Sequence, residues 1–351
     1  MTTDPTAAPV AATATPTEDR AATVRVAFWN TWLLAPRLWT TGPRLPGLDG
    51  WFAPDVEERA PLVGQALAGR FDVAALSECF ERSEQDAVAR GWPEATLVAG
   101  PRARRPRLTG SGLATLVGPD VQLVRTAQHG YRSGGDLRDS DTFATKGAQF
   151  VAVRVHPDLP PVEVISTHLF AGGDLLPVPG SEDATRHHAA RMRQVDELVA
   201  FAEREHDPAS PLLIVGDFNV QARDPDPSLP DPADRYRDLA TRLGRLQVTD
   251  VWADHGVGRG PTCTFASPDE LPPDPDEPDQ VLDEAEAEAE ATAPRSRKER
   301  IDYLWLSVPD GLAVEVERPR RWAFSGRPAR GGPAGSLSDH LALSVTLHLR
   351  A

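Results

Sequence analysis

The feature that most constrains the fold is an uninterrupted apolar run that ends abruptly in polar residues, at positions 212–219 (LLIVGDFN). Four successive apolar residues are typical of a strand that is buried on both faces. Gly216 lets the backbone turn closely, and Asp217 and Asn219 share one face if the chain stays extended. A carboxylate beside an amide suits a metal-bound phosphate, because one orients a metal or water and the other donates to phosphate oxygens. The alternative is an ordinary turn capped by Asp217 or Asn219.

The same arrangement recurs along the chain, because other chemically active side chains stand at the edges of predicted strands. Helical periodicity at 55–69 and at 184–205 separates pairs of strands, which predicts two β-α-β units at 24–76 and 162–215. Polar strand ends of a layered α/β protein meet along one edge of its sheets, so we expect a single site there. The strand-edge residues are Asn30, Glu78, His168, Asp217, Asn219, Asp302, Asp339 and His340.

Two segments lie outside the predicted core. Residues 1–23 are rich in Ala, Thr and Pro and predict a disordered tail before one domain at 24–351. A Pro-rich acidic segment at about 267–298 predicts a disordered insertion, because its Glu-Ala alternation cannot build a core. Residues 269–290 hold eleven Asp and Glu, and subtracting these from the net charge of −15 leaves −4. The mildly acidic body disfavours nucleic acid as a partner without excluding it.

The sequence shows no targeting or membrane-spanning pattern. Its first residues lack a basic start and an apolar run, and no run of 18 apolar residues occurs anywhere. We therefore expect a cytoplasmic monomer, or a secreted protein if the start site is assigned wrongly. Cys79 and Cys263 predict two buried thiols, with a single disulfide as the alternative.

Two further stretches each have two interpretations. The Trp- and Leu-rich residues 31–54 form either a loop packed over the body or an apolar rim that meets the substrate. The four arginines of residues 102–107 either steer a phosphate or are simply solvated.

The strand-edge residues together supply what metal-assisted phosphoester hydrolysis requires. They offer hard oxygen ligands for Mg²⁺, amide and imidazole donors for phosphate oxygens, and a base for water. The sequence has no Cys/His cluster for structural zinc, no Gly-x-Ser-x-Gly elbow and no P-loop. Hydrolysis of a phosphoester is therefore the reaction that this set favours.

These residues also occur in short motifs whose order resembles that of the endonuclease/exonuclease/phosphatase superfamily. The resemblance implies an α/β (α+β) fold, a four-layered sandwich in which two packed mixed β-sheets are flanked by helices, with the active site at their top edge. The motifs are Asn30, Leu76-Ser77-Glu78, Ser111-Gly112-Leu113, Thr167-His168-Leu169, Gly216-Asp217-Phe218-Asn219, Arg300-Ile301-Asp302-Tyr303 and Ser338-Asp339-His340.

The same resemblance implies a role for each site residue. Mg²⁺, with Mn²⁺ as a substitute, is the expected metal. By this resemblance Glu78 is a metal ligand with Asn30 close to the metal, and Asp339 supports the metal site. His340 is the general base, and Asp302 orients its ring. By the same resemblance Asp217 binds or orients the nucleophile, and Asn219 and His168 donate to the phosphoryl oxygens.

Within the superfamily, three further motifs are similar to the neutral sphingomyelinase-like branch. They are Trp29-Asn30-Thr31-Trp32-Leu33-Leu34, Lys146-Gly147 and Arg191-Met192-Arg193-Gln194. The resemblance favours a lipid headgroup or another small phosphodiester as substrate. A nuclease acting on DNA or RNA is the alternative, and a catalytically inactive binding module whose acidic insertion recruits a basic partner is a third hypothesis.

Overall fold

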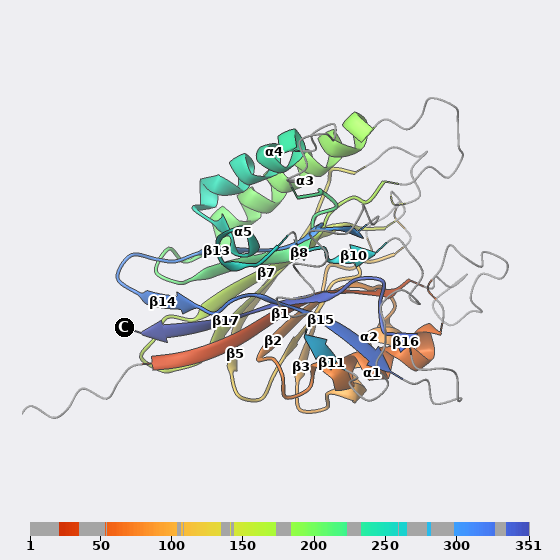
Figure 1. Ribbon diagram of the computed structural model, residues 1–351, viewed down its shortest axis with the longest axis horizontal. Helices are drawn as coiled ribbons and strands as arrows, with labels where there is room; N and C mark the ends of the chain where they lie inside the picture. Colours follow the sequence, from red (N-terminus) through yellow and green to blue (C-terminus); the bar gives the residue numbers. More distant parts are fainter. Residues whose placement is uncertain are drawn as a thin grey trace, which may run out of the picture.

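The protein is a sandwich of two β-sheets with helices on both outer faces, as the computed structural model shows (Figure 1). This arrangement confirms the predicted four-layered α/β sandwich with two mixed sheets. The structure describes residues 21–34, 53, 55–103, 107, 109–134, 141, 144–172, 184–222, 233–258, 260–264, 279–281, 298–326 and 335–350.

The larger sheet has nine strands, and its path runs β11-β15-β17-β1-β2-β4-β3, with β14 beside β17 and β16 beside β15. The central strands β1 and β2 are parallel, whereas β1 and β17 are antiparallel. Its strands are β1 (Ala21–Leu33), β2 (Val73–Cys79), β3 (Thr96–Ala99), β4 (Ala114–Val117), β11 (Asp279–Val281), β14 (Ala313–Val316), β15 (Arg320–Gly326), β16 (Gly335–Ser336) and β17 (Ala342–Arg350).

The smaller sheet has six strands in the order β5-β6-β7-β8-β13-β9. Here β7 and β8 are parallel, and β13 pairs antiparallel with β8. Its strands are β5 (Gln122–Gly130), β6 (Gly147–Arg154), β7 (Val162–His168), β8 (Leu212–Asp217), β9 (Thr249–Asp250) and β13 (Asp302–Ser307), and a separate two-stranded ladder joins β10 (Cys263–Thr264) to β12 (Lys298–Glu299).

Each sheet is covered on its outer face by a different pair of helices. α1 (Val56–Leu67) and α2 (Arg82–Gly91) pack on the nine-stranded sheet, and α3 (Ala184–Glu205) and α4 (Ala233–Leu243) pack on the six-stranded sheet (Figure 1). The crossovers β1-α1-β2 and β7-α3-β8 confirm the two predicted β-α-β units. A short turn η2 (Gly244–Leu246) and α5 (Val251–His255) follow α4. None of the described helices combines the length and the apolar character needed to cross a membrane.

The packing of β8 explains its continuous apolar run. Leu212 and Ile214 belong to the core shared with α3 and α4, whereas Leu213 and Val215 belong to the core between the two sheets. All four side chains are fully buried, and each such burial stabilises the fold by about 1.5–3 kcal/mol. A strand with two buried faces cannot alternate apolar with polar residues, so the sequence shows an unbroken run.

The bounds of the body differ from the prediction at two places. β1 begins at Ala21, three residues before the predicted start at 24, because β17 extends alongside it to Arg350. Within the acidic segment, Asp279–Val281 forms β11 on the edge of β15. The sequence of β11 has a single apolar residue and low strand propensity, so the free edge of β15 rather than propensity explains its pairing. Residues 1–20, 35–52 and most of the acidic segment lie outside the described residues.

Candidate active site

Strand register brings three of the predicted site residues into one row. His168 at the end of β7 is paired with Asp217 at the end of β8, and Asp217 is paired with Asp302 at the start of β13. Gly216 permits this close pairing, because a Cβ atom there would lie 2.3 Å from the carbonyl oxygen of Thr167. The glycine of the motif is therefore needed for the approach of β7 to β8 rather than for a turn.

The nine-stranded sheet contributes a second row from its own strand ends. Asn30 in β1 is paired with Ser77 in β2, and Glu78 follows Ser77. The buried amide of Asn30 joins the two rows, since its Nδ2 donates to Glu78 Oε1 at 3.1 Å and to Asp217 Oδ2 at 3.0 Å. One side chain therefore aligns two carboxylates that come from different sheets.

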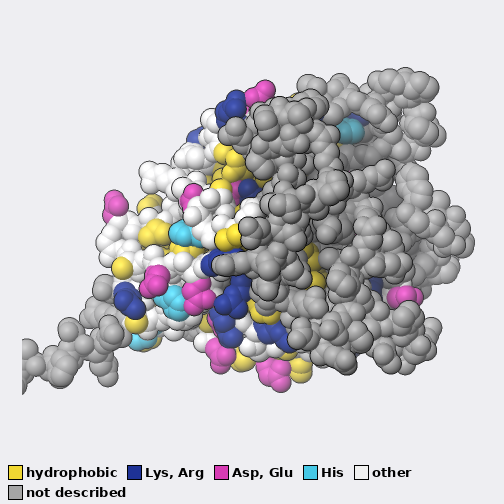
Figure 2. Space-filling model, viewed as in Figure 1, with side chains coloured by type: hydrophobic (Ala, Val, Ile, Leu, Met, Phe, Trp, Pro, Cys, Tyr) yellow, Lys and Arg dark blue, Asp and Glu magenta, His cyan; other side chains and the backbone are white. Residues whose placement is uncertain are grey.

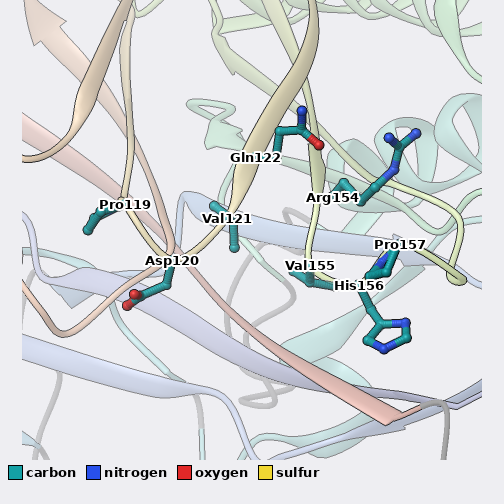
Figure 3. A pocket seen from close by; sticks show the side chains of 8 residues that line it. All are labelled: Pro119, Asp120, Val121, Gln122, Arg154, Val155, His156 and Pro157. Carbon is teal, nitrogen blue, oxygen red and sulfur yellow. The ribbon is translucent and has the colours of Figure 1, made fainter.

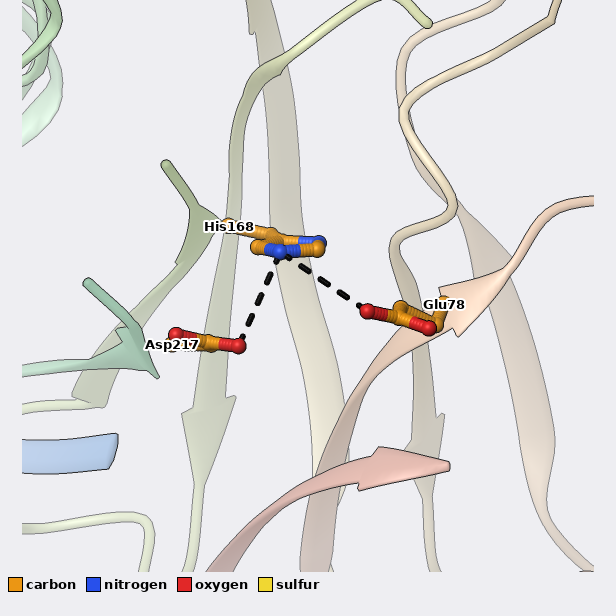
Figure 4. Close-up of side chains that lie close together, drawn as sticks. All are labelled: Glu78, His168 and Asp217. Atoms are coloured by element: carbon orange, nitrogen blue, oxygen red, sulfur yellow. Dashed lines mark ion pairs between the residues drawn. The ribbon is translucent and has the colours of Figure 1, made fainter. Parts of the chain in front are cut away.

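Glu78, His168 and Asp217 point toward one another across the gap between the sheets (Figure 4). His168 Nε2 lies 3.6 Å from Asp217 Oδ2 and 4.0 Å from Glu78 Oε1. One ligand atom from each of the three residues lies within 4.8 Å of the other two. Such spacing is compatible with a shared cation, because carboxylate oxygens and imidazole nitrogens are both metal ligands.

The second group consists of Asp217, Asp302 and His340, whose ligand atoms also lie within 4.8 Å of one another. His340 Nδ1 contacts Asp302 Oδ2 at 2.8 Å, so the carboxylate fixes the orientation of the imidazole. The backbone N–H groups of Ile301 and Asp302 both donate to the hydroxyl of Thr262, at 3.3 and 3.2 Å. Asp302 Oδ1 is buried and has no hydrogen-bond partner among the described residues.

Burial disfavours the ionised form of three acids of the site. Burial raises the pKa of Glu78, and the neighbouring Asp339 raises it further. Burial together with the charge of Asp302 raises the pKa of Asp217 to about 7, and burial also raises the pKa of Asp339. A bound cation would relieve the cost that raises these three pKa values.

The two imidazoles of the site are shifted in opposite directions. Burial, Lys146 and His340 lower the pKa of His168 well below its usual value, so His168 is neutral at pH 7. For His340, burial opposes protonation, but Asp302 and Cys263 outweigh it and raise the pKa well above the usual value. His168 is therefore a neutral hydrogen-bonding partner, whereas His340 is a strong proton acceptor.

Backbone strain collects at this edge of the sandwich. Among the described residues, five non-glycine residues have a positive φ, and three of them border the site: Trp32 (46°), Glu78 (57°) and Asn219 (51°). Such conformations cost about 1–3 kcal/mol each and persist only where the surroundings hold them. They turn the chain sharply at the ends of β1, β2 and β8, which places the polar side chains that follow.

Two predicted residues lie at the margin of the site. Asn219 Nδ2 donates to the carbonyl of Leu169 at 3.2 Å, and its backbone N–H donates to Asp217 Oδ1 at 2.9 Å. Asp339 interacts electrostatically with Glu78 and with His340, but it belongs to neither group of potential metal ligands among the described residues. Their predicted roles toward phosphate and metal stay predictions.

The structure adds residues to the site that their motifs did not identify as functional. Lys146 is buried, and its Nζ lies 3.3 Å from His168 Nε2 and 3.0 Å from Asp141 Oδ1. It places a positive charge beside the predicted phosphate donor. One signal was available in the sequence, because Lys146 is one of only two lysines and directly precedes β6. Thr262 and Arg59 gave no such signal, since their partners are distant in sequence.

Arg191 and Gln194 of α3 support the segment after His168 instead of entering the site. Arg191 donates to the carbonyls of Phe170 and Ala171, at 2.7 and 2.8 Å. Gln194 accepts from the N–H of Phe170 at 2.8 Å and donates to the carbonyl of Ser133 at 3.0 Å. The helix motif therefore anchors the chain that follows β7.

The donor set fits a hard divalent cation. Glu78 and Asp217 supply carboxylate oxygens, and both carboxyl groups have raised pKa values. Asp217 is buried, whereas the side chain of Glu78 is 19% exposed. No thiol belongs to either ligand group of the described residues. Oxygen ligands of this kind suit Mg²⁺ or Mn²⁺ better than softer metals.

A separate pocket of about 380 Å³ lies at the opposite end of the strands (Figure 3). Register places it there, because Val117, two residues before Pro119 of the pocket, pairs with Val73 at the start of β2 rather than with its end near Glu78. The pocket shares no residue with the site. Its lining residues are Pro119, Asp120, Val121, Gln122, Arg154, Val155, His156 and Pro157.

Comparison with known proteins agrees with this geometry. A sequence model of the Endonuclease/Exonuclease/phosphatase family matches residues 27–340, which includes every residue of the site. The chain belongs to that family. None of the curated protein sequences compared with the chain matches it.

Solved structures with a similar fold come from several proteins. Beta toxin from Staphylococcus aureus is 18% identical over 92% of this chain and 99% of its own, with a TM-score of 0.58. Sphingomyelinase C from Streptomyces griseocarneus is also 18% identical, over 92% of this chain and 99% of its own, with a TM-score of 0.52. A mannosyl-6-phosphatase from Bacteroides thetaiotaomicron is 13% identical over 92% and 99% of the two chains, with a TM-score of 0.56. At these identities the likeness shows a shared fold.

Proposed function

We propose that this protein is a Mg²⁺-dependent hydrolase of phosphodiesters, with a phospholipid headgroup or a related small phosphodiester as substrate. One observation carries the proposal: two aligned carboxylates, Glu78 and Asp217, lie beside a separate carboxylate–imidazole pair, Asp302 and His340. The first pair suits a cation and the second suits proton transfer. Hydrolysis of a phosphoester by water requires both functions.

The residues divide the reaction among them. His340 Nε2 accepts the proton of the attacking water, while Asp302 at Nδ1 holds the ring and stabilises the imidazolium that forms. Asp217 orients the water, because it lies within 4.8 Å of His340 and is held by Asn30. His168 is a neutral donor for a phosphoryl oxygen, and the charge of Lys146 lies directly behind it.

The metal would be held by Glu78, with Asp217 and Asn30 adjacent to it and Asp339 in support. When bound, it supplies positive charge that offsets the negative charge developing on the phosphoryl group. A structure of the beta toxin with bound magnesium ions supports the choice of Mg²⁺. A cation held by Glu78 would also lower the pKa of His340, because two positive charges repel each other.

Surface charge supports a small or membrane-borne substrate over a long nucleic acid. On the described part of the face in Figure 2, Lys and Arg side chains lie among Asp and Glu side chains rather than in a field of one sign. Within the basic segment, Arg107 donates to the carbonyls of Tyr131 and Arg132, at 2.9 and 3.2 Å. That arginine therefore has a structural role, and the mildly acidic body, with a net charge of −4 once residues 269–290 are set aside, disfavours a polyanion.

The test is a comparison of substrates with purified protein and Mg²⁺. We expect cleavage of bis-p-nitrophenyl phosphate that disappears with EDTA and returns with Mg²⁺, and faster turnover of sphingomyelin vesicles than of abasic or nicked duplex DNA. Preferred cleavage of the duplex would identify a nuclease instead. No hydrolysis of any phosphodiester, together with binding of a basic protein partner, would favour a binding module.

A further inference from the structure

Arg59 of α1 is a charged side chain buried beside the candidate site. Only 6% of its surface is exposed, and the other buried residues of α1 are Val56, Ala60, Val63, Gly64, Ala66 and Leu67. Burying a guanidinium is costly unless its donors are paired. An arginine on this apolar face therefore has a role that a leucine could not fill.

The guanidinium donates to the backbone of two segments that are far apart in sequence. Its nitrogens donate to the carbonyl of Thr31 at 3.2 Å and to that of Trp32 at 2.6 Å, directly after Asn30. It also donates to the carbonyl of Leu337, the residue before Ser338-Asp339-His340. Arg59 thus joins the end of β1 to the loop that carries the proposed base.

Other contacts make this junction continuous with the site. Ser338 Oγ donates to the carbonyl of Asn30 at 2.6 Å, and Trp29 Nε1 donates to the carbonyl of His340 at 3.0 Å. The backbone N–H of Trp32 donates to Asn30 Oδ1 at 3.1 Å, which sets the direction of that amide. Because Trp32 has a left-handed φ of 46°, this backbone must be held by its surroundings.

The charge of Arg59 acts on the same region. Burial lowers its pKa to about 10, while Asp339, Asp55 and Glu78 oppose that shift, so the guanidinium stays protonated at neutral pH. The side chain also lies over the ring of Trp32, with 5.5 Å from Cζ to the ring centroid. It therefore holds Trp32 through a carbonyl and through the indole.

We propose that Arg59 is a positioning residue that fixes Asn30 and the Asp339–His340 loop relative to each other, and so sets the affinity of the site for its divalent cation. A planar guanidinium can donate to three carbonyls at once, whereas the single ammonium of lysine cannot match that fork. The catalytic part of this inference rests on the proposed function, and the metal-binding part does not. Loss of partners that orient metal ligands typically costs about 10–100-fold in affinity or activity.

Arg59→Lys keeps the charge and removes the fork. We expect the Mg²⁺ concentration for half-maximal thermal stabilisation to rise by about 10–100-fold. We expect kcat on bis-p-nitrophenyl phosphate to fall by a similar factor, with a smaller change in KM. The circular dichroism of the Mg²⁺-free variant should match that of the wild type.

Arg70→Lys is the matched control. Arg70 lies three residues beyond the end of the same helix and donates to the carbonyl of Ala66 at 3.0 Å, and its Cζ lies 6.0 Å from the ring centroid of Phe324. It therefore shares the chemistry of Arg59 without contacting the site. We expect Arg70→Lys to change neither the Mg²⁺ response nor kcat, and an equal loss in both variants would overturn the proposal.

Ser338→Ala tests the same junction if Arg59→Lys does not fold, because it removes one tie to Asn30 and leaves Arg59 in place. A wild-type Mg²⁺ response in the folded variant would overturn the proposal. If the wild-type protein hydrolyses no phosphodiester and Arg59→Lys still weakens Mg²⁺ binding, the proposed function fails and the positioning role stands. If the wild type is active and Arg59→Lys has the same Mg²⁺ response and the same kcat, the proposed function stands and the positioning role fails. A wild type whose thermal stability does not respond to Mg²⁺ would overturn both proposals.

Discussion

The Asp302–His340 pair and the acidic group of Glu78, Asp217 and Asp339 lie side by side, yet their charges are balanced in different ways. In the pair, the carboxylate of Asp302 contacts the imidazole of His340 at 2.8 Å and stabilises the protonated form of that imidazole. In the acidic group, burial raises the pKa of every member.

The difference shows what each part requires from outside the chain. Each member of the pair has its partner within the protein, because Asp302 contacts the ring of His340. In the acidic group, burial disfavours the ionised form of all three carboxyl groups, and a bound cation would favour it. We therefore expect substitutions in the pair to affect chemistry more than metal binding, and substitutions in the acidic group to affect both.

The largest effect is expected for His340→Ala. Removal of a general base typically costs about 10²–10⁴-fold in rate. We expect kcat on bis-p-nitrophenyl phosphate to fall within that range while Mg²⁺ still stabilises the protein in a thermal melt. The control is His348→Ala in β17, the strand that follows His340, where His348 contacts Glu317 at 2.8 Å near the surface. If His340→Ala were no longer stabilised by Mg²⁺, the Asp302–His340 pair and the acidic group would not have separate functions.

Glu78→Gln is expected to abolish the thermal stabilisation by Mg²⁺ and to lower activity by more than about 100-fold, the upper end of what loss of an outer ligand partner costs. The reason is that the amide cannot supply the negative charge that holds the cation. Glu163→Gln is the control, because Glu163 is also buried but contacts His206 far from the site. If Glu78→Gln bound Mg²⁺ as tightly as the wild type, Glu78 would not be a ligand.

The response of stability to pH provides a third test. The pKa of Asp217 is raised from 3.8 to about 7, so the folded state binds this proton more tightly than the unfolded state does. The lowered pKa of His168 makes stability rise with pH up to about 6.5. The contribution of Asp217 to the stability of the Mg²⁺-free protein, in contrast, falls as pH rises from about 4 to about 7. The raised pKa of His340 acts in the same direction, because its contribution is present below pH 6.5 and is lost as pH rises through the folded-state pKa.

Added Mg²⁺ should reverse this trend, because protons and the cation compete for the same carboxylates. At one hundred times Kd, a ligand adds about 2.7 kcal/mol of stability, which corresponds to several degrees of Tm in a domain of this size. We expect that shift at pH 8 and a much smaller one at pH 5, measured by differential scanning fluorimetry. An equal shift at both pH values would show that Mg²⁺ binds elsewhere.

The smallest effect is expected for Thr262, whose hydroxyl accepts a hydrogen bond from the backbone N–H of Asp302 at 3.2 Å. Thr262→Ala should lower kcat by about tenfold or less, since loss of one hydrogen bond costs about 0.5–1.5 kcal/mol, and Thr262→Ser should restore it. Thr115→Ala is the control, because Thr115 is buried and contacts Gln149 at 2.7 Å outside the site. If both alanine variants lost stability and kept full activity, Thr262 would have a structural role alone.

Much of the fold could be predicted because local patterns agreed with the tertiary arrangement. The continuous apolar run of β8 indicated two buried faces, and the helical periodicity of α1 and α3 indicated parallel crossovers. The edges were harder to predict. β11 and the first residues of β1 pair with strands that the chain supplies elsewhere, and neither segment has strong strand propensity of its own.

The candidate site divides in the same way. Polar residues at the edges of buried strands could be identified from the sequence, because carboxylates, amides and imidazoles recur together at those edges. Arg59 and Thr262 could not, since their hydrogen-bond partners Leu337 and Asp302 are separated from them by 278 and 40 residues. Lys146 stood out through the Lys146-Gly147 motif, its rarity and its place before β6.

The sequence by itself determined which residue types stand at the strand ends, because strand burial follows from local hydrophobic patterns. Only the tertiary structure decided their protonation. The pKa of Asp217 depends on burial between two sheets and on Asp302, and that of His340 depends on Asp302 and Cys263. Electrostatic interactions act through space rather than along the chain, so the division of the site into an acidic group and an imidazole pair exists only in the folded protein.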